Sequence, residues 1–195
     1  MEFVLIRHTR CDVATGTCYG RLDVPLAESS VADIALTLAQ IPPVGAIFAS
    51  PSRRCRELAQ ALANRDACDV RVLPELMELD FGEWEGRRWD DIPREQSDPW
   101  AEDPWRLAPP RGESESDLWT RVQRAFGQIA KAETPRIAIV SHGGPLRLLR
   151  CLLTNAPIDD RWRQSIEWGA VVRVECTPEF LLTALRESAS RSSGP

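Results

Sequence analysis

The chain has 195 residues, 43% hydrophobic and 27% charged, which is typical of one globular α/β domain and short for two. A net charge of −5 argues against nucleic acid or an anionic membrane as a partner, so any anion has to be bound by a local basic cluster. The six cysteines form no C-x-x-C pair, which argues against a zinc site. We read no secretory signal and no membrane-length apolar run, and expect reduced thiols in a cytoplasmic protein.

Short apolar runs alternate with helical patterns along the chain. The patterns predict buried strands over residues 3–6, 44–49, 70–73 and 137–140. They predict helices over residues 31–38, 51–63, 116–132 and 145–153, with Pro51 in a first helical turn. Residues 170–176 and 180–185 are predicted to form a hairpin, and residues 188–195 a disordered tail.

Residues 78–116 are too irregular for one long element and carry four tryptophans and five prolines. We predict an excursion over the domain with short helices, lid-like over residues 82–116. Two roles stay open for its tryptophans. They either pack the excursion onto the domain or stack on an aromatic base of a ligand.

Strands alternating with helices predict an α/β fold, a three-layer sandwich with a mainly parallel central sheet flanked by helices, in one domain over residues 1–187. In such sheets, ligands bind beyond the carboxyl ends of the strands. Three predicted strand ends would bring Arg7, His8, Arg54, His142 and Gly143 to one edge. Arginines, histidines and a helix N-terminus together predict a site for a phosphate dianion.

The chain contains two histidines, and each follows an apolar run. A neutral imidazole can attack phosphorus and form a phosphohistidine when its other ring nitrogen donates to a fixed acceptor such as a backbone carbonyl. Arg7 and Arg54 would neutralise the phosphoryl oxygens, and His142, protonated or as a neutral donor, would bind a third. Gly143 would let the backbone approach the phosphate. The leaving oxygen needs a proton, and carboxyl groups after the third predicted strand are the candidate acids: Glu75, Glu78, Asp80, Glu83 and Glu85.

A series of ordered motifs resembles those of the histidine phosphatase superfamily, also called phosphoglycerate mutase-like. The motifs are L-I-R-H-T at residues 5–9, C-Y-G-R-L-D-V-P-L at 18–26, S-P-S-R-R-C-R at 50–56, E-L-D-F-G-E-W-E-G at 78–86, G-E-S at 112–114 with R-V at 121–122, and S-H-G-G at 141–144. Within the superfamily, the R-H-T opening and the loop at 18–26 resemble the α-ribazole phosphatases of cobalamin synthesis.

The resemblance implies a phosphoglycerate mutase-like fold and a role for each matched residue. It makes Arg54, rather than Arg53, the second phosphate arginine after Arg7, and it makes Glu78 the proton donor beside His8 and His142. Because arginines supply the positive charge, we expect no metal or other cofactor. The expected partner is a small phosphorylated metabolite, and a homodimer is left open.

Several neighbouring residues are candidates either for the pocket or for the protein surface. Tyr19, Gly20 and Arg21 are candidate pocket residues. Arg53 and Arg56 are interpreted as solvated helix charges, and Glu83 and Glu85 as surface or structural. Residues 112–114 either cap the following helix or bring Glu113 towards the pocket.

Two positions depart from the superfamily pattern. Thr9 stands where most members have glycine, and Ala14 where many have an asparagine that contacts phosphate. The Ala14 departure removes one phosphate contact, so Arg7, Arg54 and His142 would have to suffice.

Three functions fit these residues. A phosphomonoesterase would pass the phosphoryl group to water, and a mutase would return it to a retained substrate. The third is a non-catalytic phospho-ligand binder. The chain is short for a cofactor-dependent mutase and has few extra basic residues, and the complete His–Arg–Glu–His set argues against a binder. We therefore expect a phosphomonoesterase.

Overall fold

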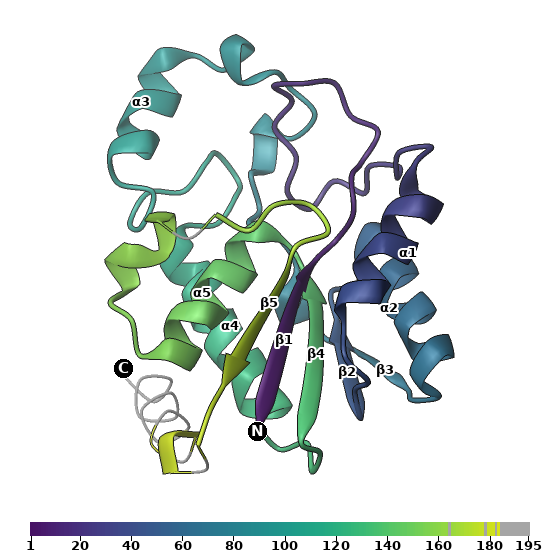
Figure 1. Cartoon of the computed structure of the whole chain (residues 1–195). Helices are drawn as coiled ribbons and strands as arrows, with labels where there is room; N and C mark the ends of the chain where they lie inside the picture. Colours follow the sequence, from purple (N-terminus) through teal and green to yellow (C-terminus); the bar gives the residue numbers. More distant parts are fainter. Residues whose placement is uncertain (164, 178, 182, 184–195) are drawn as a thin grey trace.

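A five-stranded sheet forms the centre of the computed structural model, which describes residues 1–163, 165–177, 179–181 and 183. The strand order is β3-β2-β4-β1-β5 (Figure 1). The strands are β1 (Glu2–Arg7), β2 (Ala46–Ala49), β3 (Val70–Val72), β4 (Arg136–Ser141) and β5 (Val171–Glu175). All neighbouring pairs are parallel except β1 with β5, so the predicted mainly parallel sheet is confirmed.

Side chains that alternate along β1 separate two hydrophobic cores. Phe3 and Leu5 lie in one core, together with side chains of α4 (Glu115–Ile129) and α5 (Gly143–Thr154). Val4 and Ile6 point into the other core, with side chains of α2 (Arg53–Asp66) and, beside it, α1 (Ser30–Gln40). All four β1 side chains are fully buried, which contributes about 2 kcal/mol each. The helices therefore cover both faces of the sheet, as the predicted three-layer sandwich requires (Figure 1).

The four predicted helices start one or two residues away from the predicted positions, and α1 begins at Ser30 instead of residue 31. α4 begins at Glu115 because Ser114 and Asp117 form a reciprocal capping box, which confirms that residues 112–114 lead into a helix cap. α2 begins at Arg53 with Ser52 as its N-cap, so Pro51 precedes the first turn instead of standing in it. α5 begins at Gly143, directly after His142.

The stretch between β3 and α4 forms short helices, as predicted. They are η1 (Pro74–Leu76), η2 (Gly82–Trp84), η3 (Trp89–Asp91) and α3 (Arg94–Glu102). Backbone hydrogen bonds of 2.8 Å join Cys18 to both Arg87 and Gly86. This stretch therefore lies against the loop after β1, beyond the carboxyl ends of the strands (Figure 1). Trp84 is buried with Cys18 and Ile92 in a small third core, which is the packing role considered for the tryptophans. Opening of the excursion as a lid stays a prediction.

Of the two strands predicted for the C-terminal hairpin, the first is present and the second is wrong. β5 is present, but it pairs with β1, and the described residues Phe180, Leu181 and Thr183 are helical rather than extended. Thr177 starts this turn, since its carbonyl accepts from the Leu181 amide at 3.1 Å and its hydroxyl from the Phe180 amide at 3.2 Å. Leu181 reaches the core from a helical backbone. Residue 182 and residues from 184 on, including the predicted tail, lie outside the described part.

All six cysteines are free thiols. In the part of the chain that the structure describes, no helix has the length and apolarity needed to cross a membrane.

Replacing Gly127 by alanine is expected to stabilise the fold. Gly127 lies inside α4, where an added Cβ meets no atom within 4 Å, and alanine is about 0.5–1 kcal/mol better than glycine in a helix interior. The urea midpoint should rise for Gly127→Ala. As a matched control, Gly45→Ala should lower the midpoint, because its Cβ would overlap the Thr134 hydroxyl. A lower midpoint for Gly127→Ala would contradict this packing.

Candidate active site

The parallel register of β1 and β4 places the two histidines side by side. Arg7 is paired with Ser141 at the last position of the ladder, and the His8 amide donates to the Ser141 carbonyl at 3.1 Å. His8 and His142 follow directly, with ring centroids 5.2 Å apart and rings inclined by 66°. The predicted convergence of these strand ends is therefore present in the structure.

His8 is held as a neutral imidazole with one ring nitrogen free. Its Nδ1 lies 2.8 Å from the Thr9 carbonyl, and because a carbonyl only accepts, Nδ1 carries the proton and Nε2 the lone pair. Burial lowers the pKa of His8 to about 3, and the nearby charges of Arg54 and Arg7 act in the same direction. A neutral imidazole with an unprotonated Nε2 is the form that can attack phosphorus.

Arg54 and Arg7 carry positive charge into this buried site. Arg54, at the start of α2, is 1% exposed and donates to the carbonyls of Leu22 at 2.8 Å and Gly20 at 2.5 Å. Arg7 donates to the Ile166 carbonyl at 2.8 Å. Among the described residues, neither arginine forms an ion pair with a carboxylate, and the Nε of each is buried without a hydrogen-bond partner. Two guanidinium groups held by carbonyls keep their charge available for an anion.

Each of these arginines is backed by an aromatic ring. The Arg7 Cζ lies 5.5 Å from the centre of the Trp168 ring, and the Arg54 Cζ 5.5 Å from the centre of the Tyr19 ring. Burial raises the pKa of the Tyr19 hydroxyl. An aromatic ring thus lies against each of the two guanidinium groups.

Trp168 is a site residue that the sequence analysis missed. It lies in the loop before β5, and the amide of the next residue, Gly169, donates to the His8 carbonyl at 3.1 Å. Because β5 runs antiparallel to β1, the start of β5 meets the carboxyl end of β1. The signal that could have found Trp168 is this pairing, and the hairpin prediction assigned β5 a different partner.

A cavity of about 390 Å³ opens over His8. It is lined by Arg7, His8, Val13, Ala14, Thr15, Gly16, Thr17, Tyr19, Arg54, Glu78, Phe81, Trp89 and Trp168. Five predicted site residues are thus brought to one cavity. Trp89 lines it too, so this tryptophan of the excursion faces the cavity as well as packing beside Trp100.

Four predicted residues lie outside the described cavity lining. The Gly20 carbonyl accepts from Arg54, and Arg21 forms ion pairs with Asp80 at 3.1 Å and Glu113 at 3.2 Å. Gly143 packs against Arg7, where an added Cβ would meet the guanidinium Cζ at 3.6 Å. The fourth residue, His142, is fully buried. Their roles towards phosphate stay predictions.

His142 is neutral in the free protein. Burial, followed by the surrounding positive charge, holds the pKa of His142 well below its ordinary value. Its Nε2 lies 2.8 Å from the Ser50 hydroxyl and 3.5 Å from the Cys55 sulfur. Of the two protonation states left open by the sequence, the free protein therefore has the neutral one, and donation to a phosphate oxygen stays a prediction.

Glu78 enters the cavity from the loop after η1 and is anchored at the start of α5. The Gly144 amide donates to both carboxylate oxygens at 3.2 Å, and the Leu79 amide donates to Oε1 at 2.9 Å. A Cβ on residue 144 would overlap the Glu78 carboxylate, so only glycine allows this approach.

The other acidic candidates are bound elsewhere. Glu85 accepts from the Arg21 amide at 2.7 Å and the Phe81 amide at 3.2 Å, and Glu83 pairs with Arg111 at 2.5 Å. Glu85 and Glu83 thus bind loop amides and an arginine, as expected for structural or surface residues. Within the described ranges, no cluster of three or more histidine, cysteine or acidic side chains suits a metal ion.

The two departures from the superfamily pattern have different consequences here. Thr9 contributes its carbonyl to His8, which any residue provides, and it lines a second, smaller cavity together with Trp168. Ala14 lines the cavity over His8, where its methyl group offers no hydrogen bond to a phosphate.

Comparisons with known proteins agree with this geometry. The family profile of the histidine phosphatase superfamily (branch 1) matches residues 3–185. An adenosylcobalamin/α-ribazole phosphatase of Salmonella typhimurium is 30% identical over 188 residues, which cover 92% of this chain and 93% of that protein. The crystal structure of the α-ribazole phosphatase from Shigella flexneri matches with a TM-score of 0.85 at 24% identity and covers 92% of this chain and 93% of that one.

A mycobacterial glucosyl-3-phosphoglycerate phosphatase structure matches with a TM-score of 0.76 at 25% identity, covering 88% of each chain. Phosphatases that act on different small phosphorylated molecules thus share this fold. The resemblance found in the sequence motifs is confirmed: the chain belongs to branch 1 of the histidine phosphatase superfamily.

Proposed function

We propose that this protein is a phosphomonoesterase that works through a phosphohistidine at His8. One observation carries the proposal: His8 presents an unprotonated Nε2 at a cavity, between two arginines that have no described carboxylate partner. A nucleophile, a dianion-binding charge and a carboxyl group then share one cavity, which is what phosphoryl transfer from an ester requires.

In the first half-reaction, His8 Nε2 attacks phosphorus and the bond between phosphorus and the ester oxygen breaks. Glu78, entering as a carboxylic acid, gives its proton to the leaving oxygen, so an alcohol departs. Arg7 and Arg54 bind the equatorial oxygens, whose charge they stabilise in the in-line transition state. The Thr9 carbonyl stabilises the imidazolium character that develops on the ring, through the Nδ1–H bond.

In the second half-reaction, water attacks the phosphohistidine. The Glu78 carboxylate takes a proton from that water while the N–P bond breaks, and inorganic phosphate and neutral His8 are released. The acid of the first step is therefore the base of the second, and the enzyme returns to its starting state.

For the substrate, we propose α-ribazole 5′-phosphate. The proposal is supported by the name of the 30% identical relative and by the aromatic walls of the cavity, Tyr19, Phe81, Trp89 and Trp168, which suit a flat base. A mutase is disfavoured because the described lining holds no cation besides Arg7 and Arg54 for a second anionic group. A cytoplasmic location and a homodimer stay predictions.

Replacing the nucleophile should abolish turnover. With chelator present and no added metal, His8→Ala should release phosphate from α-ribazole 5′-phosphate, sugar phosphates or an aryl phosphate at least about 1,000-fold more slowly than the wild type. Thermal melting checks that the variant is folded. Turnover that survives in His8→Ala would contradict the proposal, and isomerisation of 3-phosphoglycerate without phosphate release would identify a mutase instead.

Two adjacent arginines offer a matched pair of variants. Arg54→Ala should lower kcat/KM by about 100-fold because it removes transition-state charge stabilisation. Arg53→Ala should stay within about twofold of the wild type, since the Arg53 side chain is exposed and its ion pair within the described residues is with Glu57 on the helix surface. If Arg54→Ala unfolds, Arg54→Lys replaces it. Equal effects of the two positions would rule out a specific phosphate-binding role for Arg54.

Histidine titration should report the buried charge directly, because an untagged chain has two imidazole signals. In the free protein, neither signal should titrate near pH 6.5, since burial and the arginines lower the pKa of both rings. The unfolded chain then binds more protons than the folded one below pH 6.5, so stability should fall as the pH drops from 6.5 towards 3. Added phosphate or vanadate should raise both pKa values by offsetting the arginine charges. Ordinary titration in the free protein would contradict the site electrostatics.

A further inference from the structure

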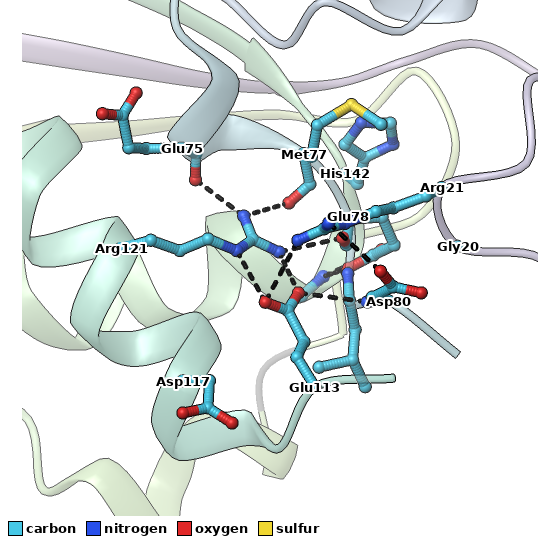
Figure 2. Close-up of polar contacts among 12 residues, drawn as sticks. Gly20, Arg21, Glu75, Met77, Glu78, Asp80, Glu113, Asp117, Arg121 and His142 are labelled. Atoms are coloured by element: carbon cyan, nitrogen blue, oxygen red, sulfur yellow. Dashed lines mark hydrogen bonds and ion pairs between the residues drawn. The ribbon is translucent and has the colours of Figure 1, made fainter. Parts of the chain in front are cut away.

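Arg121 holds the loop that carries the proposed proton donor. It lies in α4, is 6% exposed, and donates to three carbonyls of η1 and the loop that follows it (Figure 2). The distances are 2.7 Å to Glu75, 2.5 Å to Met77 and 2.8 Å to Glu78. Arg121 is absent from the described cavity lining, so we assign it no contact with a substrate.

Glu113 holds the same loop from its other side. Its carboxylate forms an ion pair with Arg121, with Nε donating to Oε2 at 3.1 Å and Nη2 donating to Oε1 (Figure 2). Oε1 also accepts from the Asp80 amide at 3.0 Å. Gly112 permits this approach, because a Cβ there would overlap the Asp80 carbonyl. The loop is therefore bound through its carbonyls by the cation and through an amide by the anion.

The ion pair is also joined to the phosphate-binding side of the site. Arg21 donates to Glu113 at 3.2 Å and pairs with Asp80 at 3.1 Å. The residues on either side of Arg21, Gly20 and Leu22, provide the carbonyls that accept from Arg54. One polar network thus connects the loop of the acid with the loop that orients a phosphate arginine.

We propose that Arg121 and Glu113 are positioning residues that fix the backbone at Glu78, so that its carboxyl group meets the leaving oxygen. The inference rests on the proposed role of Glu78. The Glu78 carbonyl is bound by Arg121 and its carboxylate by the Gly144 amide, so both ends of the residue are held. Loss of the Arg121 contacts would free the backbone end, and a displaced general acid transfers its proton poorly.

The dependence of rate on the leaving group distinguishes positioning from general stabilisation. An alkyl phosphate needs a proton on its leaving oxygen, whereas a nitrophenyl phosphate expels a stable anion and needs little help. Arg121→Lys should therefore lower kcat/KM by about 10- to 100-fold for an alkyl phosphate and by less than about threefold for nitrophenyl phosphate. kcat/KM is the appropriate measure because it reports steps up to formation of the phosphoenzyme.

Three further variants make the test decisive. Glu113→Gln should show the same selective loss, and it replaces Arg121→Lys if that variant does not fold. Arg124→Gln, an exposed arginine on the same helix, should leave both rates unchanged. Glu78→Gln tests the proposed function itself. If this variant loses kcat/KM equally for the alkyl phosphate and for nitrophenyl phosphate, Glu78 is not the general acid.

A selective loss in Glu78→Gln without one in Arg121→Lys and Glu113→Gln would overturn the positioning proposal alone. Equal losses on the two substrates in Arg121→Lys would likewise overturn it, because they would indicate a merely structural contribution.

Discussion

The parallel pairing of β1 with β4 is the constraint on which the site depends. Its register ends with Arg7 opposite Ser141, so the next residue of each strand is a histidine at the same edge of the sheet. A shift of one residue would turn the alternating core side chains of β1 to the wrong faces, so hydrophobic packing in both cores enforces the register. The position of His8 beside His142 is thus a consequence of how Phe3, Leu5, Val4 and Ile6 are buried.

The site also concentrates positive charge where water is excluded. Arg54 is almost fully buried, yet its hydrogen bonds go to carbonyls, which orient a guanidinium without cancelling its charge. Burial, together with the same charge, lowers the pKa of both imidazoles and keeps them neutral, which maintains the His8 lone pair. Burying cations without carboxylates costs stability, and binding of a dianion returns it. Apart from Glu78, which lines the cavity, the described carboxylates near the site bind other groups, as Glu113 binds Arg121.

Much of this arrangement could be predicted from the sequence because it depends on local patterns. Apolar runs identified the strands, and residues at or just after the carboxyl ends of parallel strands gather at one edge, which predicted that Arg7, His8 and Arg54 share one cavity. Contacts set by distant segments could not be predicted. Trp168 reaches the site only because β5 pairs with β1, and Arg21 is directed to Glu113 and Asp80 by a loop far along the chain. The helical turn at Phe180 likewise depends on packing against the core rather than on its β-forming side chains.

In the proposed mechanism the phosphoryl group is transferred twice, first to His8 and then to water. The most direct measurement is the stereochemical course of hydrolysis for a phosphate ester made chiral at phosphorus with oxygen isotopes and sulfur. Two successive in-line displacements invert the phosphorus centre twice, so hydrolysis through a phosphohistidine should give overall retention of configuration. Overall inversion would show that water attacks the ester directly, and it would contradict a phosphohistidine at His8.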